Sequence, residues 1–586
     1  MKKLLYAIAV SGLLASCNNN QQANNSPSAN GDDAFKSLSD TFISGYLKWR
    51  PATAIYLGIH DYDGQISDLS QPSLDAELDR LKKYDAELAS TDTASLSSKM
   101  FYDFRILRNA VKNEIFSFEE LNVYARNPIL YAYAADISIY IKRDFAPLEQ
   151  RLQYLISIEN QLPGLFAVAK QNLKNTLAKP LVQTAMDVAS GFAVFMKGDL
   201  LIAVKDVNND TLMASFKKAN ASAIAAINDY VQWLKTKRLP QADNNYAIGK
   251  ENYQKMLLYN EDMSISSGEI LAIGLKELKK EQDEFNAAAK IINPNKKPID
   301  VFHDVQKEHS TADSLISDAK RHLENIRQFV IDKKIMTIPS DVRVQVKETP
   351  EFARSTSTAS MDMPGPFEKK ATESYYYITP VDPKWNAKQK EDWLSMFDYY
   401  TTDNVSIHEA YPGHYVQGLH LNASDATDIE KIFGSYAFIE GWAHYCEKMM
   451  IEEGWSNNGD SITAAKYHLA QSGDALLRIC RLCVSIKMHC QGMTLDEGTK
   501  FFMDNWYQGE KPSYQEALRG TFDPGYLFYT VGKLEILKLR EDYKQQEGSN
   551  YSLMKFNDAI NDNGMPPVRL LRERLLKDTS KWAEVL

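Results

Sequence analysis

The sequence predicts a mainly α-helical fold with one small β-sheet. Apolar residues recur at helical spacing from Phe35 onward, in one segment after another. Strand-like runs are few and gather between residues 335 and 380. The chain has 586 residues, of which 44% are hydrophobic and 25% charged, so it can form two or three domain-sized cores or one large lobed fold.

The first residues predict export. A basic start is followed by the apolar run Leu4–Leu14, which is too short to span a bilayer, and by small residues before Cys17. Residues 1–17 therefore resemble a bacterial lipoprotein signal peptide in which Cys17 receives the lipid; an ordinary secretory signal cut near Ala15 is the alternative. We expect a protein anchored by lipid to the bacterial cell envelope, at the outer membrane or the periplasmic face.

The segment after Cys17 is predicted to be a flexible tether. Residues 18–34 consist largely of Asn, Gln, Ser and Gly and bury almost nothing apolar, so burial cannot offset the entropy cost of ordering them. Beyond the tether we assign residues 35–335 to an N-terminal helical region and residues 336–586 to a catalytic region.

Helices are expected in succession through the N-terminal region. The first covers residues 35–49 and ends before Pro51, which cannot continue it. Further apolar repeats at helical spacing fall at residues 74–88, 95–118, 148–161, 163–177, 182–196, 209–239 and 267–289. They show no fixed period, so we do not expect a solenoid.

The catalytic region is expected to open with the small sheet. Val342–Val346 and Ser374–Thr379 are rich in β-formers and lie among prolines. An edge strand beside an active site can pair with the backbone of a bound peptide, which would place Tyr377 near a substrate. The alternative is a structural hairpin in which the tyrosines only pack.

A catalytic metal motif is indicated by His408, Glu409 and His414, in a chain with ten histidines. Zinc binds imidazole and carboxylate ligands and keeps one position for water, and a neighbouring carboxylate can act as its general base. In the usual His-Glu-x-x-His pattern the histidines lie four residues apart on one helix face, whereas here they lie six apart. Pro412 and Gly413 between them predict a kink or π-bulge that would return His414 to the metal.

A third ligand is expected from a second helix. Glu440, His444 and Glu447 occur at spacings i, i+4 and i+7, on one face of an otherwise apolar segment. Three ionisable groups on a buried face require partners, whereas a solvent-exposed polar face would not.

Two later helical segments supply further candidates. Cys480 and Cys483 have the spacing of a metal or redox pair but lie in a continuous apolar helix, so we expect buried thiols, although export would permit a disulfide. On the same helix Arg478 would need an acidic partner, either Glu447 or a substrate carboxylate. Tyr526 and Tyr529 follow a helix start at Asp523–Pro524; a phenol there could stabilise an oxyanion, or Tyr529 could simply pack.

Three segments resemble the bacterial "domain of unknown function 885" family, which is expected to contain zinc-dependent peptidases. They are His408–His414, with the pattern HExxPGH, Glu440–Glu447 and Asp523–Lys533, and Arg50–Asp63 is similar to the family's opening segment. More distantly, the family resembles helical gluzincin-type metallopeptidases, which implies a mostly helical, two-lobed body with a deep central cleft and a glutamate as third ligand. With the strand-like runs above, we expect the small sheet to lie near the active site.

The resemblance also implies roles for these residues. His408, His414 and Glu440 would bind one Zn²⁺, and Glu409 would be the base. His444 or Glu447 would orient a ligand imidazole, and His444 is an alternative ligand. Ser485 departs from the family, which tends to carry an acid there.

The expected function is hydrolysis of peptide bonds in short or unfolded peptides, with Glu409 activating a zinc-bound water and Tyr529 beside the oxyanion. Two alternatives are a zinc hydrolase of another amide, such as a cell-wall peptide, and a non-catalytic lipoprotein that binds ligands through the same fold. The net charge of −10 and the absence of a basic stripe exclude nucleic acid as a partner. The sequence does not indicate the oligomeric state.

Overall fold

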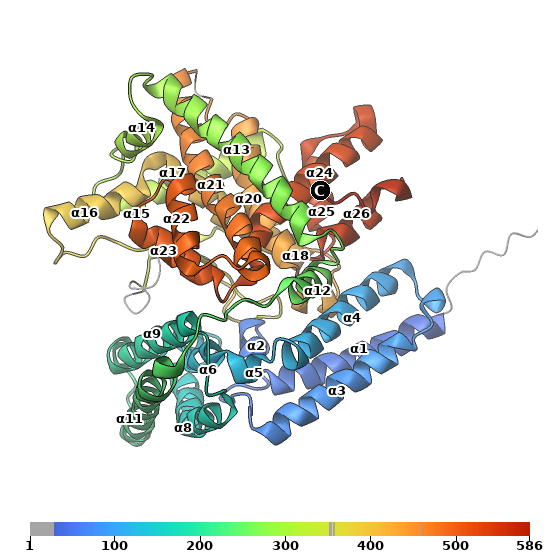
Figure 1. Cartoon of the computed structure of the whole chain (residues 1–586), viewed down its shortest axis with the longest axis vertical. Coiled ribbons are helices and arrows are strands. Elements are labelled where there is room, and N and C mark those ends of the chain that lie inside the picture. The colour runs from blue at the N-terminus through green and yellow to red at the C-terminus, as the bar shows by residue number, and fades with distance from the viewer. Residues whose placement is uncertain (1–28, 351–353, 355–357, 458) are drawn as a thin grey trace, which may run out of the picture.

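The computed structural model is mainly α-helical, which confirms the predicted fold class (Figure 1). It describes residues 29–350, 354, 358–457 and 459–586. The expected signal peptide with Cys17, and the tether up to residue 28, lie outside the described residues. Within the described part of the chain, no helix combines the length and the apolar character that crossing a membrane requires.

Residues 29–34 were expected to belong to the tether, and this was wrong. They form the first turns of helix α1 (Ala29–Trp49). Asp32 in this stretch accepts a hydrogen bond from the backbone N–H of Ser97 at 2.8 Å, so a tertiary contact holds residues that composition alone predicts to be free.

The N-terminal helices form one body, which occupies the lower half of Figure 1. After α1 it contains α2 (Pro51–Tyr56), α3 (Gln71–Ala89), α4 (Ser98–Glu119), α5 (Val123–Arg126), α6 (Pro128–Tyr133), α7 (Ile139–Lys142), α8 (Leu148–Asn172), α9 (Lys179–Lys197), α10 (Asp199–Ala203) and α11 (Asp210–Trp233). Two of the expected helices merge into α8, because buried residues on both sides of Pro163 belong to one continuous core.

The second body contains the rest of the chain and lies above the first in Figure 1. Its helices before the sheet are α12 (Lys250–Glu261), at the junction of the two bodies, α13 (Ser267–Ile292), α14 (Pro298–Val305) and α15 (Leu315–Asp332). Those after the sheet are α16 (Ala387–Leu394), α17 (Tyr399–Glu409), α18 (His414–Ala423), α19 (Asp428–Ile432), α20 (Tyr436–Glu452), α21 (Ser461–Gln491), α22 (Leu495–Trp506), α23 (Glu510–Gly520), α24 (Phe528–Glu547), α25 (Leu553–Asn561) and α26 (Val568–Leu575).

The two bodies do not divide at residue 335, where we placed the boundary. Helix α13 packs along α21, and Gly274 lies so close to Leu482 that a β-carbon at this glycine would be 2.3 Å from the leucine side chain. Helix α15 packs on α17. Both α13 and α15 therefore belong to the body that carries the metal motif, and a change in composition along the chain does not mark this boundary.

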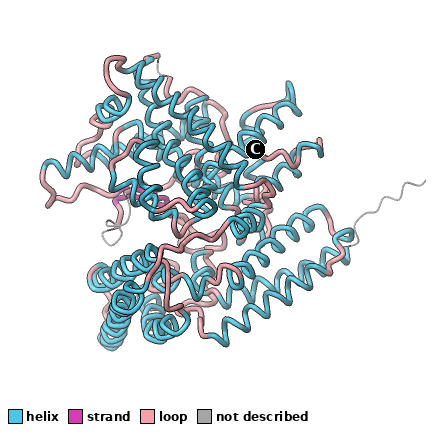
Figure 2. Tube along the Cα trace, viewed as in Figure 1, coloured by secondary structure: helices cyan, strands magenta, loops and turns pink. Residues whose placement is uncertain are grey.

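The small sheet has three strands in the order β1 (Gln345–Glu348), β3 (Tyr375–Ile378), β2 (Ala359–Asp362), and Figure 2 shows it as a minor part of a helical molecule. Strand β3 pairs in parallel with β1 and antiparallel with β2. The strand that contains Tyr377 is therefore central, and the edge strands are β1 and β2.

Side chains of the N-terminal body hold the segment that joins β2 to β3. Arg143 donates hydrogen bonds to Asp362 Oδ1 at 2.6 Å and to the carbonyl of Ala371 at 3.2 Å. The His60 ring lies 3.0 Å from a carboxylate oxygen of Glu368. The position of edge strand β2 thus depends on both bodies.

Candidate metal centre

The helix that carries the metal motif is interrupted between its two histidines. Helix α17 ends at Glu409 and α18 begins at His414, and the Tyr411–Pro412 peptide bond between them is cis. The distortion is therefore a complete break rather than the kink or π-bulge that we expected. Gly413 lies so close to the preceding turn that a β-carbon there would be 1.8 Å from the carbonyl oxygen of His408, so only glycine fits.

The break brings both imidazoles to one carboxylate. His408 Nε2 lies 3.5 Å and His414 Nε2 lies 3.6 Å from Glu440 Oε2, and the two rings are nearly perpendicular, at 89°, with centroids 4.9 Å apart. One ligand atom of each residue lies within 4.8 Å of the others. In the described ranges this is the one group of three or more His, Cys, Asp or Glu side chains that could hold a metal ion.

The donor spacing fits one tetrahedral ion. With ligand bonds of about 2.0–2.1 Å, two donors of a zinc tetrahedron lie about 3.3 Å apart. The observed separations of 3.5 and 3.6 Å are close to this value and too long for good hydrogen bonds. Glu440 Oε2 is accordingly a buried oxygen without a hydrogen-bond partner among the described residues. A buried carboxylate oxygen that faces two imidazoles is well suited to bind a cation.

Close packing of two helices positions Glu440. Helix α20 crosses α24 at glycines: a β-carbon on Gly441 would lie 2.5 Å from the backbone of Gly532, and one on Gly532 would lie 1.8 Å from the carbonyl of Ala437. This approach also brings Tyr529, in the first turn of α24, into the electrostatic neighbourhood of Glu440.

Glu447 lies at the centre of a buried network behind the cluster. One carboxylate oxygen is 2.7 Å from His408 Nδ1 and 3.1 Å from Arg478 Nη2. The other is 3.1 Å from His444 Nδ1 and accepts a hydrogen bond from Asn404 at 3.4 Å. The contact with His408 leaves Nε2 of that ring directed at Glu440, which is the arrangement that a metal-bound imidazole requires.

The network shifts the pKa values of its members. Burial acts to raise the pKa of Glu447, but the Arg478 charge and the two imidazoles outweigh it and hold the pKa well below its usual range. Burial also opposes ionisation of Glu440, whose pKa is nevertheless held low by His408 and His414. For His408, burial is outweighed by the carboxylates of Glu440 and Glu447, which raise its pKa to about 9. Binding of a cation at neutral pH would therefore displace a proton from this ring.

His444, the alternative ligand, does not lie with the three candidate ligands. Its Nδ1 faces Glu447, its side chain is fully buried, and it is not a member of the cluster. Burial and the nearby Lys533 charge hold its pKa well below the usual value, so the ring is neutral.

Glu409 lies between the cluster and the sheet. It is the last residue of α17, and its Oε2 accepts a hydrogen bond from the backbone N–H of Met361 at 3.3 Å. Met361 is on β2, so an edge strand of the sheet adjoins the expected general base.

The three expected tyrosines occupy different surroundings. Tyr529 lies among arginines, with the guanidinium carbon of Arg481 5.1 Å from its ring centroid and that of Arg519 5.8 Å away. Tyr526 is fully buried and packs against Gly520, so the structure does not bring it to the cluster. Tyr377 stacks on Tyr375 across the face of β3 that points away from α17.

Several residues that contact the site were not predicted from the sequence. Tyr376, not Tyr377, faces α17, where Ser406 Oγ donates to its hydroxyl at 3.3 Å. Asn404 and Met361 were also missed; the position of Asn404 one turn before His408, on the same helix face, could have indicated it. Met361 acts through its backbone, for which the sequence carries no signal.

Other expectations concern residues outside the cluster. Arg478 does pair with Glu447, one of the two partners expected for it. Cys480 and Cys483 are buried free thiols. A further histidine, His420, was not among the predicted site residues. It makes structural contacts, with Nδ1 2.7 Å from Asp562 and Nε2 2.8 Å from a backbone carbonyl.

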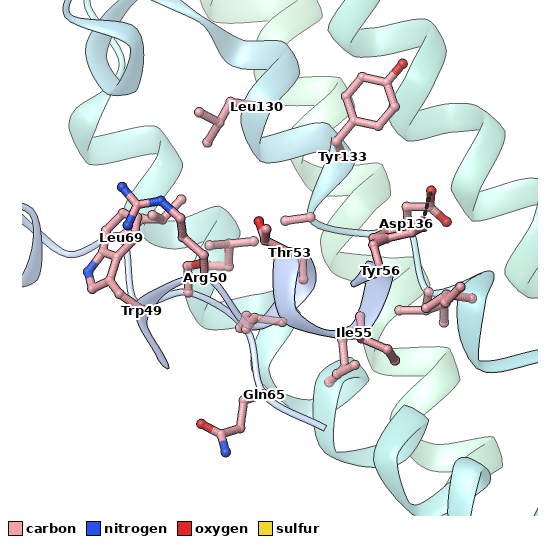
Figure 3. A pocket seen from close by; sticks show the side chains of 18 of the residues that line it. Trp49, Arg50, Thr53, Ile55, Tyr56, Gln65, Leu69, Leu130, Tyr133 and Asp136 are labelled. Atoms are coloured by element: carbon pink, nitrogen blue, oxygen red, sulfur yellow. Dashed lines mark hydrogen bonds between the residues drawn. The ribbon is translucent and has the colours of Figure 1, made fainter. Parts of the chain in front are cut away.

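Two cavities differ in their relation to the cluster. One of about 390 Å³ is lined in part by His414 and therefore opens beside the candidate ligands. Another, of about 330 Å³, lies in the N-terminal body and is shown in Figure 3. Its lining includes Trp49, Arg50 and Tyr56, whose hydroxyl donates to Asp136 at 3.3 Å, and none of the cluster residues. The second cavity is separate from the candidate centre.

Fold and site together define a large helical protein in which two bodies meet near a small sheet and a candidate His₂Glu metal centre. The family comparison agrees with the resemblance in the motifs. The chain belongs to the family described as "Bacterial protein of unknown function (DUF885)", whose model matches residues 51–575. The comparison with curated proteins finds no match.

Two solved structures share the fold over nearly the whole chain. A "putative lipoprotein of unknown function" from Shewanella oneidensis is 25% identical, with a TM-score of 0.78 over 93% of this chain and 100% of that one. A protein from Colwellia psychrerythraea, also described as a putative lipoprotein, is 18% identical, with a TM-score of 0.77 over 94% of this chain and 99% of that one. Neither description states an activity.

Proposed function

We propose that this protein is a zinc-dependent peptidase of the bacterial cell envelope that hydrolyses peptide bonds in short or unfolded peptides. One observation carries the proposal. A buried Glu440 oxygen without a hydrogen-bond partner faces two imidazole nitrogens at 3.5 and 3.6 Å, beside Glu409 and an edge strand. This combination is typical of metallopeptidases: three ligands, a carboxylate beside them that does not bind the ion, and a site for strand addition.

His408, His414 and Glu440 would hold the ion, and Glu447 would fix the ring of His408. A bound Zn²⁺ supplies Lewis acidity, which polarises a carbonyl group and lowers the pKa of water. In hydrolysis, the C–N bond of the peptide breaks and a bond forms between the carbonyl carbon and the water oxygen. Glu409 takes one proton from the water and passes it to the leaving amine.

Two further groups would act on the substrate. Tyr529 lies near Glu440, and its phenol can donate a hydrogen bond to the oxyanion that forms on the carbonyl. The outer edge of β2 presents backbone groups next to Glu409, so a peptide can bind there as an added strand whatever its sequence.

Two independent observations support the proposed location in the cell envelope. Residues 1–17 have the pattern of a lipoprotein signal, and two structures with the same fold are described as putative lipoproteins. An anchor at Cys17 would place the enzyme where peptides of the envelope are its substrates.

The test is cleavage of a mixed short-peptide library by the purified protein, with and without chelator, together with its metal content. We expect cleavage that the chelator abolishes and zinc restores. The variant Glu409→Gln should keep its metal and lose turnover by at least about 10³-fold, because the carboxylate base is gone. Loss of metal in this variant would assign Glu409 a different role.

The outcomes also distinguish the other functions. Cleavage of cell-wall peptides but not of linear peptides would favour the amide-hydrolase alternative. Metal binding without cleavage of any amide would favour a non-catalytic binding protein. If no divalent metal supports hydrolysis of any peptide, the peptidase proposal is wrong.

A further inference from the structure

The cavity beside His414 has one end at the candidate centre. The cavity has a volume of about 390 Å³, and its lining includes His414 and Ile439, the residue before Glu440. The lining also includes Met363, which follows β2 closely. A peptide added to the edge of β2 with its scissile bond at the cluster would therefore extend into this cavity.

The walls are mostly apolar, but two polar side chains lack partners. Gln417 is only 2% exposed, and its side-chain nitrogen has no hydrogen-bond partner in the described structure. Lys431 also lines the cavity. Its ammonium group forms no salt bridge among the described residues, and the adjacent carboxylate of Glu430 pairs with Arg574 instead. That ammonium group lies 5.9 Å from the centroid of the Phe367 ring.

The Lys431 ammonium group can bind a ligand of one chemical class. The ammonium group is a hydrogen-bond donor with a positive charge, and a carboxylate is the ligand group that satisfies both properties. The surrounding apolar wall includes Met363 and Ile439, which suits a hydrophobic side chain. A peptide offers a carboxylate next to a side chain at its C-terminus.

We propose that this cavity binds the C-terminal residues of the substrate, with the terminal carboxylate paired to Lys431. This inference rests on the proposed peptidase function and makes the enzyme one that removes one or two residues from the C-terminus. The volume limits the product: 390 Å³ lies at the lower end of the range for small-molecule sites, about 300–1,000 Å³.

The experiment compares two peptides of identical sequence, one with a free C-terminal carboxylate and one amidated. We would measure kcat/KM with the zinc-loaded enzyme and identify the products by mass spectrometry. The free acid should be cleaved about 10- to 100-fold faster, as expected for one charge-assisted contact, and should release one or two C-terminal residues.

The matched variants are Lys431→Met and Lys388→Met. Lys431→Met should lower kcat/KM for the free acid to about the level of the amide, whereas Lys431→Arg should restore part of the preference. Lys388 is an exposed lysine of α16 that pairs with Asp392, so Lys388→Met should change neither rate. A thermal unfolding curve of each variant would show that the fold is intact.

Failure of this inference differs from failure of the proposed function. Equal cleavage of acid and amide, or release of long C-terminal fragments, overturns the C-terminal assignment and leaves the peptidase intact. If neither peptide is cleaved, binding of a blocked dipeptide acid and its amide, measured by calorimetry, still decides. A preference for the acid that Lys431→Met abolishes supports the pocket, and equal binding overturns it.

Discussion

Replacing Glu447 by Gln tests the network that supports the candidate metal centre. The variant keeps the shape of the side chain and one acceptor oxygen, but it loses the charge and one acceptor. In the native network the two oxygens contact His408 at 2.7 Å, Arg478 at 3.1 Å and His444 at 3.1 Å. An amide can serve one of these sides only, so either the ligand imidazole loses its orientation or the buried guanidinium loses its counterion.

The magnitude follows from these contacts. Loss of one hydrogen bond to a charged group costs about 1.5–3 kcal/mol, which corresponds to about 10- to 100-fold in an equilibrium constant. Changes behind a ligand histidine weaken metal binding by a similar factor. We therefore expect Glu447→Gln to bind zinc about 10- to 100-fold more weakly than the wild type and to unfold at a lower temperature.

The assay is a competition titration of the metal-free protein against a chromophoric zinc chelator at fixed pH. Glu452→Gln is the control, because Glu452 is on the same helix but pairs with Arg540 at a more exposed position, 3.1 Å away. The control should bind zinc as tightly as the wild type. If Glu447→Gln also bound zinc within about twofold of the wild type, the carboxylate would not support the site, and our account of the network would be wrong.

Two further changes probe the break and a buried acid. Gly413→Ala should weaken zinc binding more than 10-fold and lower the unfolding temperature, because its β-carbon would lie 1.8 Å from the carbonyl oxygen of His408. The control is Gly164→Ala, which should change neither property because no atom lies within 4 Å of its β-carbon. Normal zinc affinity in Gly413→Ala would refute this prediction. Burial raises the pKa of Glu159 to about 8, so this carboxyl group contributes stability that is lost as pH rises from about 4.5 to 8. Glu159→Gln should remove that contribution, on the order of a few kcal/mol in denaturant titrations; parallel pH profiles of stability for variant and wild type would contradict it.

Periodic features of the sequence predicted the fold class and most helices. Helical spacing of apolar residues is a local signal, and so is the helix stop at Pro51. The division between the two bodies is not local, since α13 joins the C-terminal body through packing on α21. Likewise, nothing within residues 29–34 shows that Asp32 will cap a distant backbone N–H.

The candidate site could be predicted as far as its residues share a helix or a motif. His408, His414 and Glu440 stand out because ionisable residues in apolar helices are rare. The strand that contains Tyr377 was predicted, but the face that this residue occupies was not. Alternation along β3 places neighbouring tyrosines on opposite faces, and only the packing of α17 decides which face is turned toward the motif. The hydrogen bond from Met361 comes from a backbone group, which no residue type reveals.

The stretched spacing of the motif has a structural consequence beyond returning His414 to Glu440. On a continuous helix, both histidines and the intervening glutamate would move as one rigid unit. Here His408 and Glu409 end one helix and His414 begins another, so the two imidazoles approach Glu440 from helices with separate supports. His408 is held by the Glu447 network, whereas His414 depends on the break at Gly413 and lines the cavity proposed for the substrate. A ligand in that cavity would therefore contact His414 directly and reach His408 only through the ring contact and the Glu440 oxygen that the two imidazoles share.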